Sequence, residues 1–192
     1  MTSIAKRFAT EVDIADLPEN VVGEIIDGDL VVSPRPGGPH ARAASVAGMV
    51  IGNPYDLGHG GPGGWWILFE PELHFTPNIV VPDIAGWRRE RMPEIPSDHR
   101  FRVAPDWVCE VISPSSASTD RIRKLRIYAR AGVQYAWIID PLSTSLEVYR
   151  NVNDTWSLVQ GFSAEEGDKL VRAEPFADIE LDLTAMWQRS QA

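Results

Sequence analysis

The chain has 192 residues, of which 44% are hydrophobic and 23% are charged, and this ordinary globular composition excludes a disordered or collagen-like chain. Because a domain averages about 150 residues, we expect a single domain over 1–192, with an N-terminal arm at 1–20 and a core at 21–187. The sequence contains neither an apolar run of about 20 residues nor a signal-peptide pattern, so we expect a cytoplasmic protein without a membrane partner. The formal net charge of −9 argues against coating nucleic acid by charge alone. It leaves room for a nuclease, whose metal-binding carboxylates add acidic residues.

The first half of the chain alternates helical and strand patterns. Apolar residues at helical spacing predict a helical arm over 1–20, and an Asp27-Gly28 pair predicts a β-hairpin, or alternatively a bulged strand, over 23–34. An alanine-rich helix is expected over 40–51, ending before Gly52-Asn53-Pro54, with a glycine-rich turn at 58–64. Two adjacent strands are expected over 65–75 and 78–87, with a break at Pro77-Asn78.

The second half predicts a crossover between strands. After a proline-broken loop at 88–104, the short apolar run 107–113 is typical of a central buried strand. A helix follows over 120–131, with an apolar stripe and Gly132 as its stop. The remaining expected elements are strands at 135–140, 146–150 and 155–160, then one strand and a helix near 183–187. This order predicts an α/β sheet domain, with α+β as the alternative.

Carboxylates inside apolar strands are the most informative residues. Asp83 and Glu110 lie in neighbouring predicted strands, and Glu70 is a third acid of this kind. Each one taken alone could face water or pair with an arginine. Two carboxylates brought together by strand pairing need a counterion, and a hard divalent cation supplies one.

The predicted helix that follows Glu110 adds a cation. Asp120 and Lys124 are four residues apart, beside the expected apolar stripe of Ile122, Leu125 and Tyr128. One interpretation is an exposed helical ion pair of a few tenths of a kcal/mol. The other is a lysine held near metal-binding carboxylates, where it would orient a water or stabilise a developing negative charge.

Four segments together carry a resemblance: GEIIDGDLVVSP, PDIAGW, APDWVCEVISPSS and TDRIRKLRIYARAGVQYAWIIDP. They resemble a bacterial family of proposed restriction endonucleases, long classed as a domain of unknown function, within the PD-(D/E)XK nuclease superfamily. The resemblance covers about residues 20–185. It implies a restriction-endonuclease-like core, with a mixed central β-sheet flanked by helices.

Site residues follow from the resemblance residue by residue. Asp83 matches the PD half-motif, Glu110 the (D/E) position, and Glu24 a further acid that often completes the metal site. The superfamily lysine is expected two residues after Glu110, where this chain has Ile112. In this family the lysine is thought to move to the following helix, where Lys124 matches.

The remaining candidates are histidines, arginines and the single cysteine. His40 falls where the family often has histidine, and the alternative interpretation, which the residues favour, is a plain helix-end histidine. The basic side chains Arg121, Arg123 and Arg126 would contact phosphates or form a solvated helix face. His59, His74 and His99 show no ligand spacing and are left unassigned. The single cysteine, Cys109, is interpreted as a buried small hydrophobe.

The resulting hypothesis is a Mg²⁺- or Mn²⁺-dependent endodeoxyribonuclease that acts on DNA. Asp83, Glu110 and Glu24 would hold the metal, and Lys124 would assist the attacking water. The alternative is a non-catalytic nuclease-fold module that binds nucleic acid or protein. A two-carboxylate hydrolase acting on sugars fits the acids but not the lysine helix. The oligomeric state stays open, with a homodimer as one option.

Overall fold

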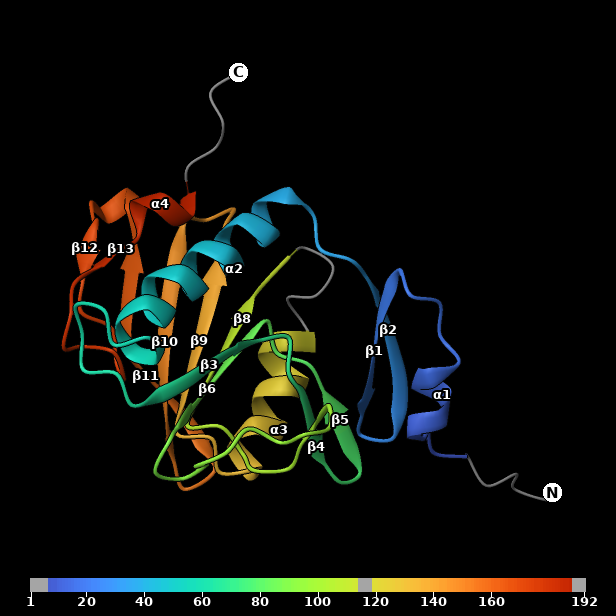
Figure 1. Cartoon of the computed structure of the whole chain (residues 1–192). Helices are drawn as coiled ribbons and strands as arrows, with labels where there is room; N and C mark the ends of the chain where they lie inside the picture. The colour runs from blue at the N-terminus through green and yellow to red at the C-terminus, as the bar shows by residue number, and fades with distance from the viewer. Residues whose placement is uncertain (1–6, 114–118, 188–192) are drawn as a thin grey trace.

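The computed structural model describes residues 7–113 and 119–187, with the side chains of the second range described from residue 121 onward. A large sheet with helices on both faces forms the centre of the structure, and a smaller sheet lies to one side of it (Figure 1). The chain crosses between the two sheets several times. These crossings position the candidate site.

The large sheet has six strands, and it is the mixed sheet that the sequence predicts. In spatial order the strands are β11 (Thr155–Ser163), β10 (Ser145–Val152), β9 (Tyr135–Asp140), β8 (Trp107–Val111), β6 (Ile84–Arg88) and β3 (Trp65–Phe69). β8 and β9 pair in parallel, whereas the other neighbouring strands are antiparallel. The predicted strand–helix–strand crossover is therefore confirmed as the connection between β8 and β9.

The small sheet has five strands. Its spatial order is β2 (Asp29–Pro34), β1 (Val21–Ile26), β5 (Asn78–Val80), β4 (Glu72–Phe75) and β7 (Arg100–Phe101). The predicted hairpin is confirmed as β1–β2, with Asp27 at φ 53° and Gly28 at φ 82° in its two-residue turn. Both positive values match the turn type that favours Asp-Gly. The two-residue β7 lies within the segment predicted to be a loop.

The prediction of two uninterrupted strands over 65–75 and 78–87 is wrong. The first run divides into β3 and β4, and the second into β5 and β6, so each run contributes one strand to each sheet. The breaks fall at Glu70-Pro71 and at Val81-Pro82-Asp83. Proline has no N–H for a ladder hydrogen bond, which explains why both strands end there.

Helices cover both faces of the large sheet. On one face lie α2 (Gly38–Ile51), its π-helical continuation η1 (Gly52–Asp56) and α4 (Thr184–Trp187). On the other face lies α3 (Leu125–Arg130), between the large and small sheets (Figure 1). The predicted helix therefore does not stop at Gly52-Asn53-Pro54, because the chain tolerates Pro54 by widening into a π-helix.

Three further helical predictions need correction. In the described part of the N-terminal arm, residues 7–20, the helix α1 covers only Glu11–Ala15, and residues 1–6 lie outside the described residues. The helix predicted over 120–131 begins as a π-helix, η2 (Thr119–Lys124), before α3. Ile122 leaves the expected apolar stripe and is 57% exposed. The helix stop at Gly132 is confirmed by its φ of 86°.

Strand β8 shows how the two faces are built. All five of its residues are buried, and the alternation of a strand sends Trp107, Cys109 and Val111 into the core beneath α2. Val108 and Glu110 belong to the opposite face, where Val108 packs in the core next to α3. The expected burial of Cys109 and of the central strand is confirmed.

The C-terminal segment closes the α2 side of the sheet. It consists of the 3₁₀-helix η3 (Ala164–Glu166), the strands β12 (Leu170–Val171) and β13 (Leu181–Asp182), and α4. The prediction of one strand here is corrected to an antiparallel pair. Among the described helices, none combines the length and apolarity needed to cross a bilayer.

Candidate functional site

The two proline-containing crossings place acidic residues at the junction of the sheets. Asp83 immediately precedes β6 rather than ending a strand, and the Glu70 N–H donates to its backbone oxygen at 3.0 Å. The Asp83 carboxylate accepts a hydrogen bond of 2.7 Å from the Val111 N–H at the end of β8. His40, in the first turn of α2, places its Nε2 atom 3.3 Å from the Asp83 carboxylate.

A buried lysine connects the two other predicted acids. The Lys124 Nζ atom lies 3.0 Å from Glu24 Oε1 and 2.9 Å from Glu110 Oε1. It also donates to the Val81 carbonyl oxygen at 2.8 Å, while the Val81 N–H donates to Glu24 at 2.8 Å. Lys124 is only 3% exposed. This burial rules out the interpretation of Lys124 as part of an exposed helical ion pair.

Tyr128 is a member of this cluster that the sequence interpretation placed only in the apolar stripe. Its hydroxyl donates to Glu110 Oε1 at 2.6 Å inside the core. Burial, and then the negative charge of Glu110, raise the pKa of Tyr128 well above its ordinary value. Tyr128 therefore remains a hydrogen-bond donor over the physiological pH range. Its spacing from Lys124, one helical turn, was the available signal.

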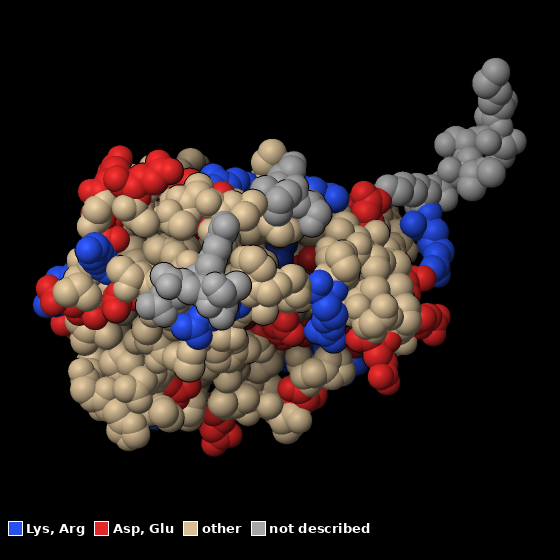
Figure 2. Space-filling view, turned by 90° about the horizontal axis from the view of Figure 1, so that it is seen from above, with Lys and Arg blue, Asp and Glu red and all other residues tan. Residues whose placement is uncertain are grey.

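The predicted acids, His40 and Lys124 line one cavity of about 410 Å³ between the sheets. Its charged and imidazole side chains come from Glu24, Arg35, His40, Glu70, Asp83, Glu110 and Lys124. On the face of the molecule seen from above, acidic and basic side chains are interspersed, and both occur in the hollow near its middle (Figure 2). The cavity lining itself combines four acidic side chains with Arg35, Lys124 and His40, so a ligand in the cavity meets a mixture of charges.

The remaining sequence candidates occupy different environments. Glu70 lines the cavity, but its side chain is 48% exposed and lies 3.5 Å from Arg35. The side chain of Asp120 lies outside the described residues. Arg121 pairs with Glu147 at 3.0 Å, and Arg123 donates to the Ile26 carbonyl oxygen at 2.7 Å. Arg126 is exposed.

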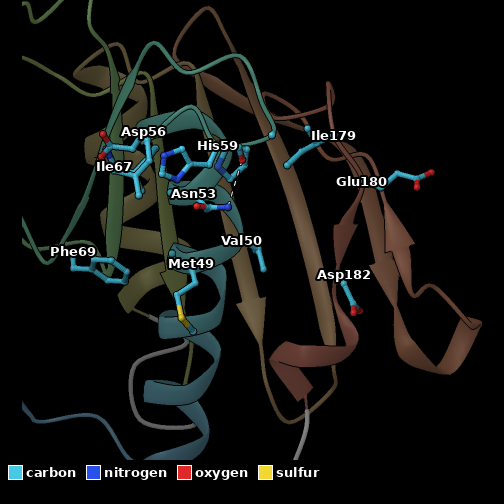
Figure 3. Close-up of a pocket in the computed structure, with 15 residues that line it drawn as sticks. Met49, Val50, Asn53, Asp56, His59, Ile67, Phe69, Ile179, Glu180 and Asp182 are labelled. Atoms are coloured by element: carbon cyan, nitrogen blue, oxygen red, sulfur yellow. Dashed lines mark hydrogen bonds between the residues drawn. The ribbon is translucent and has the colours of Figure 1, made fainter.

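A second cavity, of about 910 Å³, has a different character. Figure 3 shows Met49 and Phe69 on one flank and Glu180 and Asp182 on the other. Asp56 at this cavity is already engaged, because it accepts hydrogen bonds from the Ile67 N–H and from Arg89 at 2.9 Å each. The concentration of acids around a buried cation distinguishes the smaller cavity as the candidate site.

Comparisons with known proteins identify a family and a related fold. The sequence model of the Uma2 family, described as "Putative restriction endonuclease", matches residues 13–184. The chain is similar to a crystal structure from Anabaena variabilis, titled a putative nuclease belonging to DUF820, with 27% identity and a TM-score of 0.72. That alignment covers 90% of this chain and 94% of the other. A search of proteins with curated functions gives no significant match.

The family match spans both sheets, the crossings at Pro71 and Pro82, and the helix that carries Lys124. The structural match extends over nearly the same length and shares the restriction-endonuclease-like arrangement of a mixed sheet flanked by helices. The chain therefore belongs to the Uma2 family.

Proposed function

We propose that this protein is a metal-dependent endonuclease that hydrolyses phosphodiester bonds of DNA in the cavity between the two sheets. Membership of the Uma2 family supports a nuclease function. The observation that carries the proposal is the contact of Glu24 and Glu110 with the buried Lys124, in a cavity that Asp83 also lines. These acids come from β1, the β5–β6 crossing and β8, so only the folded chain brings them to one cavity.

The donor chemistry of the cavity fits Mg²⁺ or Mn²⁺. Carboxylate oxygens are the protein ligands that hard divalent cations prefer. Glu24, Asp83 and Glu110 would hold the ion, and the Val111 N–H fixes the orientation of the Asp83 carboxylate. When bound, the ion would lower the pKa of a coordinated water and offset negative charge on the scissile phosphate.

The chain's own residues would position the reactants. Lys124 would orient the attacking water or stabilise the negative charge that develops on the phosphoryl oxygens. Tyr128 and Glu24 hold Lys124 and Glu110 in place through their buried contacts. His40, at 3.3 Å from Asp83, would restrict the orientation of that carboxylate. Arg35, beside Glu70 at the cavity, would attract the phosphate backbone.

A cleavage assay tests this proposal. The purified protein is incubated with single-stranded, duplex and branched DNA in Mg²⁺ or Mn²⁺, and in EDTA. We expect cleavage with metal, none in EDTA, and a loss of at least about 100-fold in Asp83→Asn and in Glu110→Gln. Asp154→Asn, at the exposed β10–β11 turn, is the matched control, since asparagine tolerates the positive φ of that position.

The outcomes separate the enzyme from the binding module. Metal-dependent cleavage that disappears in the two site variants but not in the control supports the enzyme. DNA binding without cleavage, with equal affinity for the wild type and Asp83→Asn, would favour the non-catalytic module. Cleavage of RNA in preference to DNA would retain the nuclease and overturn the proposed substrate.

A further inference from the structure

A second group of metal-binding side chains lies on the small sheet. Glu72 and His74 are two residues apart in β4, so they project from the same face of the strand. His99 directly precedes β7, whose Arg100 pairs with Glu72 in the parallel register of β4 and β7. The pairing of β4 with β7 therefore brings His99 close to Glu72 and His74, although His99 is distant from both in the sequence.

The ligand atoms of these residues converge. One ligand atom each from Glu72, His74 and His99 lies within 4.8 Å of the other two. His74 Nε2 is 2.5 Å from Glu72 Oε1, and His99 Nε2 is 3.6 Å from the same oxygen. The side chains of Glu72 and His74 are 22% and 13% exposed, whereas that of His99 is 61% exposed, so the cluster is open to solvent on the His99 side.

A fourth candidate ligand comes from the N-terminal arm. The Glu11 carboxylate of α1 lies 3.7 Å from His99 Nε2 and also binds the Arg100 guanidinium. Glu11 therefore brings a second carboxylate close to the cluster.

We propose that Glu72, His74 and His99 bind a zinc ion, with Glu11 as the fourth ligand. Two imidazole nitrogens with carboxylate oxygens form a donor set that zinc uses, whereas magnesium prefers oxygen alone. Four protein ligands are typical of structural rather than catalytic zinc. The ion fastens α1 and the segment before β7 to the edge of the small sheet. None of these four residues lines the carboxylate cavity, so the inference does not depend on the proposed nuclease function.

Metal analysis and cobalt spectroscopy test the site. The full chain, purified without chelator, is dialysed and its zinc content is measured. Co²⁺ is then titrated as a visible reporter of four-coordinate binding. We expect one equivalent of zinc in the wild type. In His74→Ala and in His99→Ala the zinc affinity should fall by more than roughly 100-fold, because the loss of a ligand weakens binding more than the 10- to 100-fold effect of losing an outer-shell partner. Zinc at 100 times its Kd should raise the melting temperature by about 5 to 10 °C.

Two controls make the test specific. His59→Ala removes an exposed histidine and should keep both the zinc and the cobalt spectrum. Asp83→Asn alters the carboxylate cavity and should keep them as well. The single cysteine, Cys109, is buried and provides no competing thiolate site.

Three results would overturn the proposal. Equal zinc affinity in the wild type and His74→Ala would exclude the histidine cluster. Loss of the zinc equivalent in Asp83→Asn would assign the ion to the carboxylate cavity. Retention of iron or copper in preference to zinc would overturn the identity of the metal.

Discussion

The ammonium group of Lys124 compensates two buried carboxylates, those of Glu24 and Glu110. Lys124→Ala leaves both of them without their cation, so we expect the free energy of unfolding to fall by about 3 to 5 kcal/mol in EDTA. A divalent ion can replace the missing charge. Mn²⁺ should therefore raise the melting temperature more in Lys124→Ala than in the wild type. Urea unfolding with EDTA and with Mn²⁺ measures both effects.

Arg126→Ala provides the charge-matched comparison for Lys124→Ala. Arg126 is exposed on α3, so its removal should change the unfolding free energy by no more than about 0.5 kcal/mol. If both variants lose the same stability, Lys124 does not compensate buried charge. If both lose the same modest share of DNA cleavage, the two side chains act only by attracting phosphate.

At the scale of a single element, strand β8 holds two groups of the candidate site in place, the Glu110 side chain and the Val111 N–H. Its residues are buried on both faces and its ladder joins β6 on one side and β9 on the other. Glu110 therefore occupies a rigid position in the centre of the large sheet. Any opening of β8 would release Glu110 and the Val111 N–H that holds Asp83.

Cys109 reports directly on the opening of β8. Its thiol is fully buried, and burial, followed by the negative charges of Asp83 and Glu110, raises its pKa well above the ordinary value. Because the thiolate is the reactive form, we expect a thiol reagent to label the native protein far more slowly than the urea-unfolded protein. The rates are compared by absorbance or mass spectrometry. Rapid stoichiometric labelling of the native chain would show that β8 is not a stable central strand.

At the scale of the whole molecule, three tyrosines that are buried or partly buried limit the stability of the folded protein at high pH. Burial is the main cause that raises the pKa of Tyr128 well above 10.0, and it raises those of Tyr55 and Tyr149 to about 12. Above about pH 10 the unfolded chain releases these protons while the folded chain retains them. Proton release therefore favours the unfolded state. The contribution of these tyrosines to the free energy of unfolding is complete below pH 10 and is lost as the pH rises through their folded-state pKa values.

Unfolding experiments between pH 8 and pH 11 check this expectation. Each group of this kind steepens the decline in unfolding free energy by up to about 1.4 kcal/mol per pH unit. Tyr128→Phe removes one such group, so its stability should fall less steeply above pH 10 than that of the wild type. The same slope in both proteins would mean that Tyr128 does not retain its proton in the folded state.

Local sequence signals were sufficient wherever one short segment determines its own conformation. The Asp27-Gly28 turn, the buried run around Cys109 and the helix stop at Gly132 depend on backbone geometry and local apolarity, and all three occur as predicted. The prolines at 71 and 82 also carried a local signal, but the apolar residues around them favoured continuous strands. Both prolines end strands instead because they cannot donate to the ladder.

Tertiary structure alone decided which distant residues meet. The sequence predicted Asp83 and Glu110 as neighbours because their strands follow one another. It could not show that Lys124 is buried between Glu24 and Glu110, since that contact requires η2 to pack between two sheets. Likewise, Glu72 and His74 meet His99 only through the parallel pairing of β4 with β7. Charge compensation and metal ligation depend on distances of a few ångströms, and strand pairing sets those distances across long stretches of chain.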